Sequence, residues 1–273
     1  MSDSSVNTAS AVSTEFTALY RQHYNRLYTL AFRLTGTTEN AEDVLQTAFL
    51  NAFRAFSDFR FESTPYTWLY RIVLNASRSL WAERGRMPTD EYAESHQLSI
   101  EAVYRHISGF GNAEEAVLLE RVRESCLQMF MNCMPVKYRT VYTLRGMLQF
   151  SVKDTAEIIG ISEDVVKTRL HRAREIARTH LAGRCALVKP GAMCHCRGFA
   201  GYVQKNSRES RLQNVKVVRR LEVAATCEYE HEMREILEVD RLFATELTGM
   251  DYGAFKNRIK GLLRDNQLAL LSR

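Results

Sequence analysis

Three cysteines in the C-terminal third of this 273-residue chain lie close enough in sequence to act on one ion or on one another. They form a C-x8-C-x-C array in a segment that also contains glycine and proline. Such a loop can fold three thiolates around a metal ion, and zinc takes four ligands in a tetrahedral arrangement. Further along, a cysteine and a histidine stand four residues apart, on one face of an expected helix. The expected zinc ligands are Cys185, Cys194, Cys196 and Cys227, with His231 or His195 as alternative fourth ligands.

Two other uses of these thiols stay open, namely a redox switch and inert packing. The chain has six cysteines, and its first residues lack the basic start and apolar stretch of a signal peptide. In a cytosolic chain, cysteines favour thiol or metal chemistry over a disulfide framework. Cys126 shares a helical stripe with Val122 and Phe130, and Cys133 precedes a Met-Pro turn. We therefore expect these two cysteines to be structural.

The basic segment 167–178 contains groups suited to reading DNA. Apolar residues at helical spacing place one face inward, and the opposite face presents Lys167, Thr168, His171 and Arg172. A cation, a hydroxyl, an imidazole and a guanidinium within two turns can contact base edges and phosphates in a major groove. A solvated face on a structural helix is the competing interpretation. A short helix before it, Gly160 at the turn and a Ser162 cap together favour a helix-turn-helix.

A second polar set surrounds the helix that Pro65 is expected to start. An aromatic side chain with two guanidiniums and an amide can stack on an unpaired base and hold its phosphates. The preceding loop offers a carboxylate and hydroxyls that can read the edge of a flipped base, although helix capping explains them equally well. The helix residues are Trp68, Arg71, Asn75 and Arg78, and the loop residues are Arg60, Glu62, Ser63 and Thr64.

Helical periodicity dominates the elements that must position these groups, and β-branched alternation is scarce, so the expected fold is all-α. A polar, Ser/Thr-rich arm (1–14) is expected to be disordered. Helices follow in 15–86, then a linker with one short helix in 87–113, and a second helical domain in 114–182. An extension, 183–273, should carry helices near 207–225, 231–247 and 252–263.

Charge is distributed unevenly along a chain of net charge +5. The segment 228–240 has six acids, and the segment 167–178 has one. The opposite charges favour docking of the acidic segment on the basic helix, which would mask it, but the sequence does not decide whether the segment is held on the reading face or away from it. Apolar stripes are expected to supply most of the docking energy, because surface charges are screened. Apolar runs are too short to cross a membrane, so the protein is expected in the cytoplasm.

Two sets of motifs resemble the extracytoplasmic-function (ECF) group of sigma-70 family RNA polymerase sigma factors. VVKTRLHRAR (165–174) and MPVKYR (134–139) are similar to region 4 of that family. NAEDVLQTAF (40–49) resembles the region 2 helix that docks on polymerase, and FRFESTPYTWLYRI (59–72) resembles the loop and helix that open the −10 element. The resemblance ends near Ala182, so the cysteine-containing extension is additional.

The resemblance implies a sigma-2 domain, a linker, a sigma-4 helix-turn-helix domain and a helical extension. It assigns the −35 element to Lys167, Thr168, His171 and Arg172, and polymerase binding to Asp43 and Gln46. The expected partners are core RNA polymerase and promoter DNA, with an anti-sigma factor as a further candidate and no membrane. The protein would not be an enzyme, and its sigma function would require no cofactor, leaving zinc to the extension. A repressor or activator that binds DNA without polymerase is the competing class, and a metal sensor with degenerate sigma parts is a third.

Overall fold

The computed structural model describes residues 3–56, 59–60, 63–83, 85–111, 115–223 and 232–264. Helices make up most of it, with one pair of short antiparallel strands. The α-helices are α1 (Asp3–Thr35), α2 (Thr38–Ala55), α3 (Pro65–Ser77), α4 (Pro88–Ser95), α5 (Ile100–Ser108), α6 (Ala116–Cys133), α7 (Val136–Val141), α8 (Val152–Ile159), α9 (Glu163–Leu181), α10 (Cys196–Lys205), α11 (Glu232–Phe243) and α12 (Tyr252–Arg264). Short helical turns are η1 (Arg78–Leu80), the π-helical η2 (Tyr142–Met147) and η3 (Glu209–Arg211), and the strands are β1 (Lys216–Arg220) and β2 (Thr245–Thr248).

The N-terminal unit is formed by α1, α2 and α3, which pack their apolar stripes together. Gly36, at φ +87°, ends α1, and the Thr37 hydroxyl caps α2 by accepting from Asn40 N. The disordered arm expected over 1–14 is wrong from Asp3 onward, because α1 begins there. Once the apolar turns from Phe16 fix a helix, polar residues can extend it without a new nucleation step.

The helix-turn-helix unit is built as its sequence predicts. Gly160 adopts φ +78° between α8 and α9, and the Ser162 hydroxyl accepts from Val165 N. Val166 and Leu170 point into the core of this unit, as do Ala173 and Ala177. In the linker, where one short helix was expected, two are found: α4 and α5.

The extension departs most from expectation. The helix predicted over 207–225 is wrong: this segment holds η3 and then β1, which pairs with β2. The helix predicted over 231–247 ends at Phe243, because the next residues form β2. α12 matches the helix predicted over 252–263, whereas α10, in the cysteine-containing segment, was not expected.

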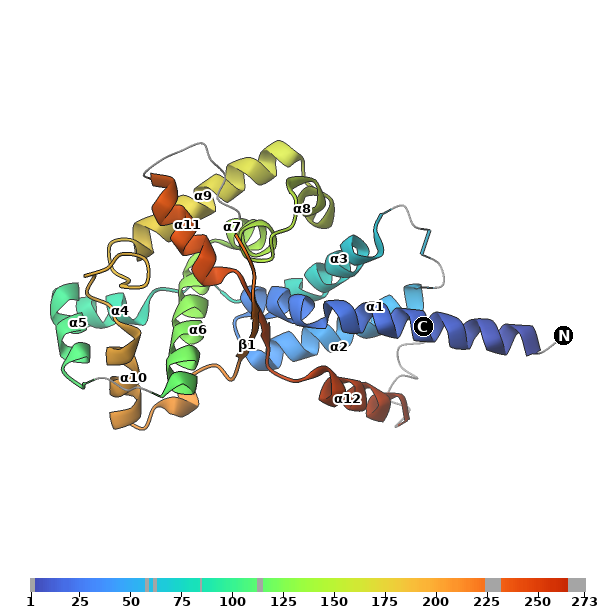
Figure 1. Ribbon diagram of the computed structural model, residues 1–273, viewed down its shortest axis with the longest axis horizontal. Coiled ribbons are helices and arrows are strands. Elements are labelled where there is room, and N and C mark those ends of the chain that lie inside the picture. The colour runs from blue at the N-terminus through green and yellow to red at the C-terminus, as the bar shows by residue number, and fades with distance from the viewer. Residues whose placement is uncertain are drawn as a thin grey trace.

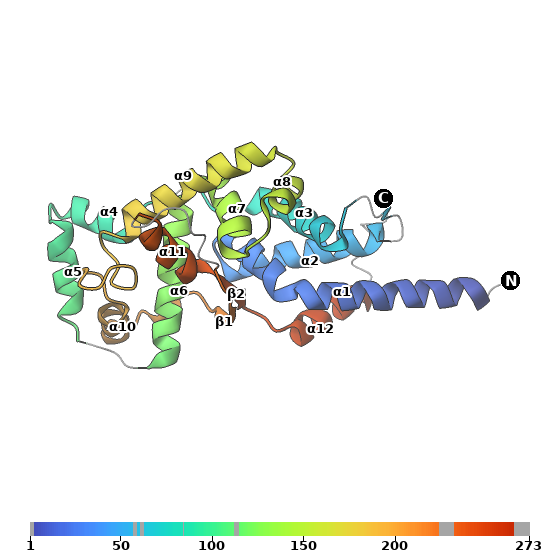
Figure 2. The ribbon, with the colours of Figure 1, turned by 45° about the horizontal axis from the view of Figure 1, so that its top comes forward.

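The extension lies across both helical units and does not form a separate body (Figure 1). In Figures 1 and 2 the two strands cross the middle of the molecule, between the N-terminal unit and α6. β2 packs on α1, and α11 packs on α9. The core of the N-terminal unit therefore includes Val215, Leu247, Phe255 and Ile259 from the extension.

Candidate nucleic-acid interface

The predicted reading face of α9 is open to solvent. Lys167, Thr168, His171 and Arg172 are all exposed. Lys167 pairs with Asp164 at 3.2 Å, and Arg172 with Glu175 at 2.8 Å. Such exposed pairs contribute little to stability, so both cations can exchange these carboxylates for phosphates or base edges. The Thr168 hydroxyl donates to Asp164 O at 2.9 Å and keeps its acceptor lone pairs.

The described part of the extension contacts α9 beside this face without covering it. The Arg174 guanidinium pairs with Asp240 of α11 at 2.7 Å, and the Tyr142 hydroxyl donates to the same carboxylate at 2.9 Å. Burial raises the pKa of Asp240. The charge of Arg174 and the hydrogen bond from Tyr142 act in the opposite direction and lower it. Docking of the acidic segment is therefore found at Asp240, and the described residues of that segment lie beside the reading face without covering it. Residues 228–231 of that segment lie outside the described residues.

The second predicted set is only partly free to meet a base. Trp68 packs in an aromatic group, with ring centroids 4.9 Å from Phe59 and 6.2 Å from Phe56. Arg71 donates a hydrogen bond to Glu157 O of α8 at 2.6 Å, so its guanidinium is already bound to the helix-turn-helix unit. Asn75 and Arg78 are exposed.

In the loop before α3, Thr64 performs the capping role that was one of its two interpretations. Its hydroxyl accepts from Thr67 N at 3.3 Å and lies 2.7 Å from the Thr67 hydroxyl. Arg60 is exposed and Ser63 is half-buried. Glu62 lies outside the described residues.

The predicted polymerase-binding residues lie on α2, where α12 reaches them. The Asp43 carboxylate is 3.2 Å from Arg258 of α12. Gln46 is half-buried, and its Oε1 accepts no hydrogen bond from any residue that the structure describes. Nothing in the sequence around Asp43 pointed to Arg258, because the two residues are 215 positions apart.

The cysteine array folds back on itself. Cys194 N donates to Arg184 O at 2.8 Å, and Ala186 N donates to Cys194 O at 3.0 Å, which aligns the chain at Cys185 with that at Cys194. Cys194, Cys196 and Cys126 of α6 line one cavity of about 280 Å³. Cys126, expected to be structural, is therefore a neighbour of the array that its sequence position does not indicate.

These thiols are held in their neutral form. Burial, reinforced by neighbouring thiols, raises the pKa of Cys194 to about 12 and that of Cys196 to about 11. Thiols of this kind are poor nucleophiles near neutral pH. Over the described part of the chain, no three cysteine, histidine or acidic side chains are placed to hold a metal ion. Cys227 and His231 lie outside that part, and His195 is exposed at the start of α10.

No helix within the described ranges is long and apolar enough to cross a membrane.

Comparison with known proteins identifies both helical units. The family model of Sigma-70 region 2 matches residues 19–87, and that of Sigma-70, region 4 matches residues 124–176. The RNA polymerase sigma-H factor of Pseudomonas aeruginosa is 30% identical over 160 residues, covering 59% of this chain and 82% of that protein. The ECF RNA polymerase sigma factor SigW of Bacillus subtilis is 31% identical over 159 residues, covering 58% and 83%.

A solved structure, that of CnrH in complex with the cytosolic domain of CnrY, is also similar. It is 24% identical, covers 63% of this chain and 90% of that one, and has a TM-score of 0.41. The matched regions include α2, α3 and the helix-turn-helix, and they stop before the extension. This chain therefore belongs to the ECF sigma factors, which direct promoter-specific initiation of transcription and are not enzymes.

Proposed function

We propose that the two helical units of this sigma factor read different promoter elements. Lys167, Thr168, His171 and Arg172 of α9 read the −35 element in the major groove. The observation that carries this proposal is the open face of α9, where Lys167 and Arg172 make exposed ion pairs. The face projects from a helix fixed on its other side by Val166 and Ala173.

The −10 element falls to α3 and the loop before it. The exposed Asn75 and Arg78 at the end of α3, and the exposed Arg60 in the loop before it, offer an amide and two cations to a single strand. Trp68 and Arg71 would join them once their present neighbours move away. Glu62, Ser63 and Thr64 complete the proposed set, with Thr64 also serving as the cap of α3.

Core RNA polymerase binds to the face of α2 that carries Asp43 and Gln46. Asp43 presents an exposed carboxylate beside the apolar stripe of the helix. A polar group at the edge of an apolar surface suits a protein interface. An anti-sigma factor, if the cell supplies one, would compete for this face or for that of α9.

The −35 assignment is tested by Arg172→Ala in holoenzyme assembled with core polymerase. Promoters are selected by the holoenzyme from a DNA library randomised at the −35 element. A lost base contact removes about 1–3 kcal/mol of discrimination, so we expect preference at one or two positions to fall by roughly 5- to 150-fold.

Arg105→Ala is the matched control, because Arg105 is an exposed arginine on α5, away from α9. It removes the same charge and should leave the selected sequences unchanged. Selection of the same −35 sequence by Arg172→Ala and the wild type would overturn the assignment.

A further inference from the structure

We propose that the C-terminal extension is a built-in inhibitor: α12 covers the polymerase-binding face of α2, and the β1–β2 pair holds the promoter-reading units together. This inference rests on the proposed function of the α2 face. The inhibitor is part of the same chain, so no second protein is needed to keep the sigma factor inactive.

The first support is a charge contact at the proposed docking face. Arg258 of α12 lies 3.2 Å from the Asp43 carboxylate and 3.3 Å from that of Glu42. Both acids lie on α2, one exposed and one half-buried. A guanidinium between two carboxylates neutralises the charge that a polymerase surface would meet. While Arg258 stays there, Asp43 is not free to bind a cation of the polymerase.

The second support is the apolar side of α12. Phe255 and Ile259, one turn apart, are 2% and 4% exposed. The Phe255 ring lies 5.9 Å from Tyr20, stacked, and 5.8 Å from Phe49, edge-on. Because exposed ion pairs are weak, these contacts with α1 and α2 supply most of the attachment, and Arg258 fixes its register.

Two hydrogen bonds hold the chain where it enters α12, at Met250 and at Tyr252. The Tyr24 hydroxyl donates to Met250 O at 3.0 Å, and the Tyr252 hydroxyl donates to Thr17 O at 3.3 Å. Tyr24 and Thr17 belong to α1, so these bonds hold α12 to α1 while Arg258 holds it to α2. The covering is therefore a built contact of several side chains.

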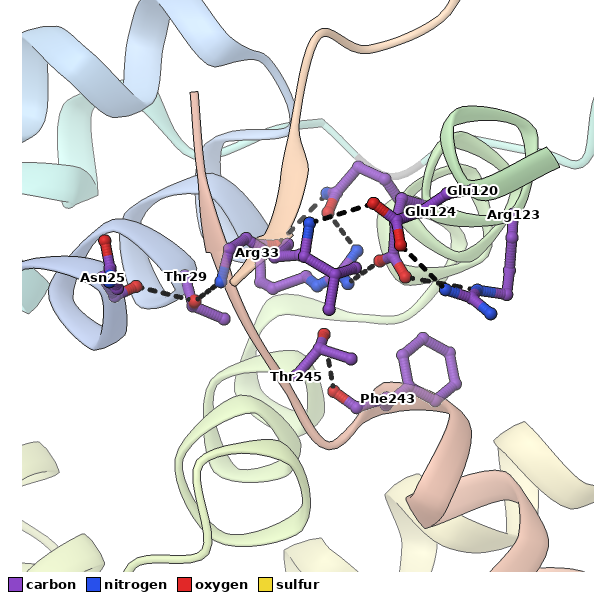
Figure 3. Close-up of polar contacts among 11 residues, drawn as sticks. Asn25, Thr29, Arg33, Glu120, Arg123, Glu124, Phe243 and Thr245 are labelled. Atoms are coloured by element: carbon purple, nitrogen blue, oxygen red, sulfur yellow. Dashed lines mark hydrogen bonds and ion pairs between the residues drawn. The ribbon is translucent and has the colours of Figure 1, made fainter. Parts of the chain in front are cut away.

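The third support is the junction that the strands occupy (Figure 3). Leu247 N of β2 donates to the Thr29 hydroxyl of α1 at 2.8 Å. Val217 N of β1 donates to the Glu120 carboxylate of α6 at 3.3 Å. Because β1 and β2 pair with one another, the sheet links the two units. Beside it, Arg33 of α1 pairs with Glu124 of α6 at 2.7 Å, with both side chains fully buried.

This closed arrangement is incompatible with reading both promoter elements at once. The elements are about 25 base pairs apart, or roughly 85 Å at about 3.4 Å per base pair. Here α3, assigned to the −10 element, contacts α8 of the helix-turn-helix through Arg71 and Glu157. The two units must therefore separate before initiation, and the extension opposes that separation.

The experiment uses the full-length chain and leaves the proposed docking residues unchanged. Arg258→Glu places a third acid beside Glu42 and Asp43 and should repel α12. Phe255→Ala with Ile259→Ala removes the apolar attachment. Lys256→Glu is the matched control, because it makes the same charge change on α12 at an exposed residue without an ion pair to any described residue.

Two quantities are measured for each protein: hydrogen exchange of the α12 backbone and affinity for core polymerase. For Arg258→Glu and for Phe255→Ala with Ile259→Ala, we expect faster hydrogen exchange in α12 and an affinity for core polymerase that is higher by about tenfold or more. The reason is that apparent affinity scales with the fraction of chains whose α2 face is uncovered. Run-off transcription should rise in parallel. Lys256→Glu should match the wild type.

The outcomes separate the inhibitor from the function on which it rests. Released α12 with unchanged affinity would overturn the inhibitor while leaving polymerase binding in place. Unchanged hydrogen exchange in both Arg258→Glu and the Phe255→Ala/Ile259→Ala variant would show that these contacts do not hold α12. That result would also overturn the inhibitor proposal. If neither the wild type nor a released variant binds core polymerase, the proposed docking face itself is wrong.

Discussion

At the scale of single residues, Arg139 joins parts of the chain that are distant in sequence. Its buried guanidinium donates to Leu34 O and Ala82 O at 3.2 and 3.1 Å, and to Asn132 O and Met134 O at 2.9 and 3.1 Å. Burial lowers its pKa to about 10. The four carbonyls come from the end of α1, the segment just after η1 and the end of α6, so one side chain connects three segments.

We expect Arg139→Lys to lower the free energy of unfolding by roughly 2–4 kcal/mol. A lysine ammonium is a compact charge with three donors, and it cannot reach four carbonyls arranged around a planar guanidinium. Carbonyls left buried without a donor then destabilise the fold. Urea unfolding followed by circular dichroism measures the change. Arg105→Lys on the surface should shift stability by less than about 0.5 kcal/mol, and an equally small effect at Arg139 would contradict this account.

Residue roles could be predicted where local geometry sets them. Gly160 has the left-handed backbone that its place in the turn required, and Ser162 caps α9. Partners distant in sequence could not be predicted. Arg71 was expected to face DNA, yet it bonds to a carbonyl 86 residues away. Spacing along one helix says which side of it a residue takes, but not which other element covers that side.

At the scale of elements, α9 could be predicted because its hydrogen bonds are local, whereas β1 depends on a partner distant in sequence. The stripe Leu212, Val215, Val218 and Leu221 has helical spacing, and it predicted a helix over 207–225. The strand forms because its partner, β2, lies about thirty residues further on and supplies the hydrogen bonds. Valines also favour extended backbone. Single-sequence periodicity contains no information on that pairing, whereas a helix such as α9 closes its own hydrogen bonds.

The cysteine loop is the element whose chemistry is still a prediction. Cys185, Cys194 and Cys196 lie together, and Cys126 lines the same cavity as two of them. Zinc would displace the thiol protons, which burial holds in place near neutral pH, so binding would release protons. If the loop binds zinc as the sequence predicts, protein purified without chelator should contain about one zinc ion per chain by elemental analysis. Chelator should then lower its unfolding midpoint.

A double variant, Cys194→Ser with Cys196→Ser, should lose this zinc and the effect of chelator. Cys133→Ser is the control, because Cys133 stands apart from the array at the end of α6 and donates to Met129 O. Wild-type protein that contains no zinc and unfolds identically with and without chelator would leave the loop as packing only.

At the scale of the whole molecule, the extension makes two sigma units into one structure. The apolar core around α1, α2 and α3 takes in Leu144 and Phe150 from the helix-turn-helix side and Leu247 and Phe255 from the extension. The sequence predicted separate units, because each has its own helical stripes. It could not show that they share a core, since that depends on contacts between residues more than a hundred positions apart.

A shared core predicts that the wild-type chain unfolds in one cooperative transition. In scanning calorimetry, the calorimetric and van't Hoff enthalpies should then agree. Leu247→Ala should change this behaviour. Leu247 is fully buried against α1, and replacing it removes about 2–5 kcal/mol of packing at the junction. With that coupling weakened, the helix-turn-helix unit and the N-terminal unit should unfold at separate temperatures.

Leu45→Ala distinguishes lost coupling from lost stability. Leu45 is also fully buried, but it lies in α2 within the N-terminal unit. Its replacement should lower the midpoint by a similar free energy while keeping one transition, because the junction is untouched. Two transitions in the wild type would mean that the units are independent even with the extension in place. A single transition in Leu247→Ala, at a lower temperature, would mean that β2 adds stability without coupling the units, and that the closed arrangement depends on Arg33, Glu124 and Arg139 instead.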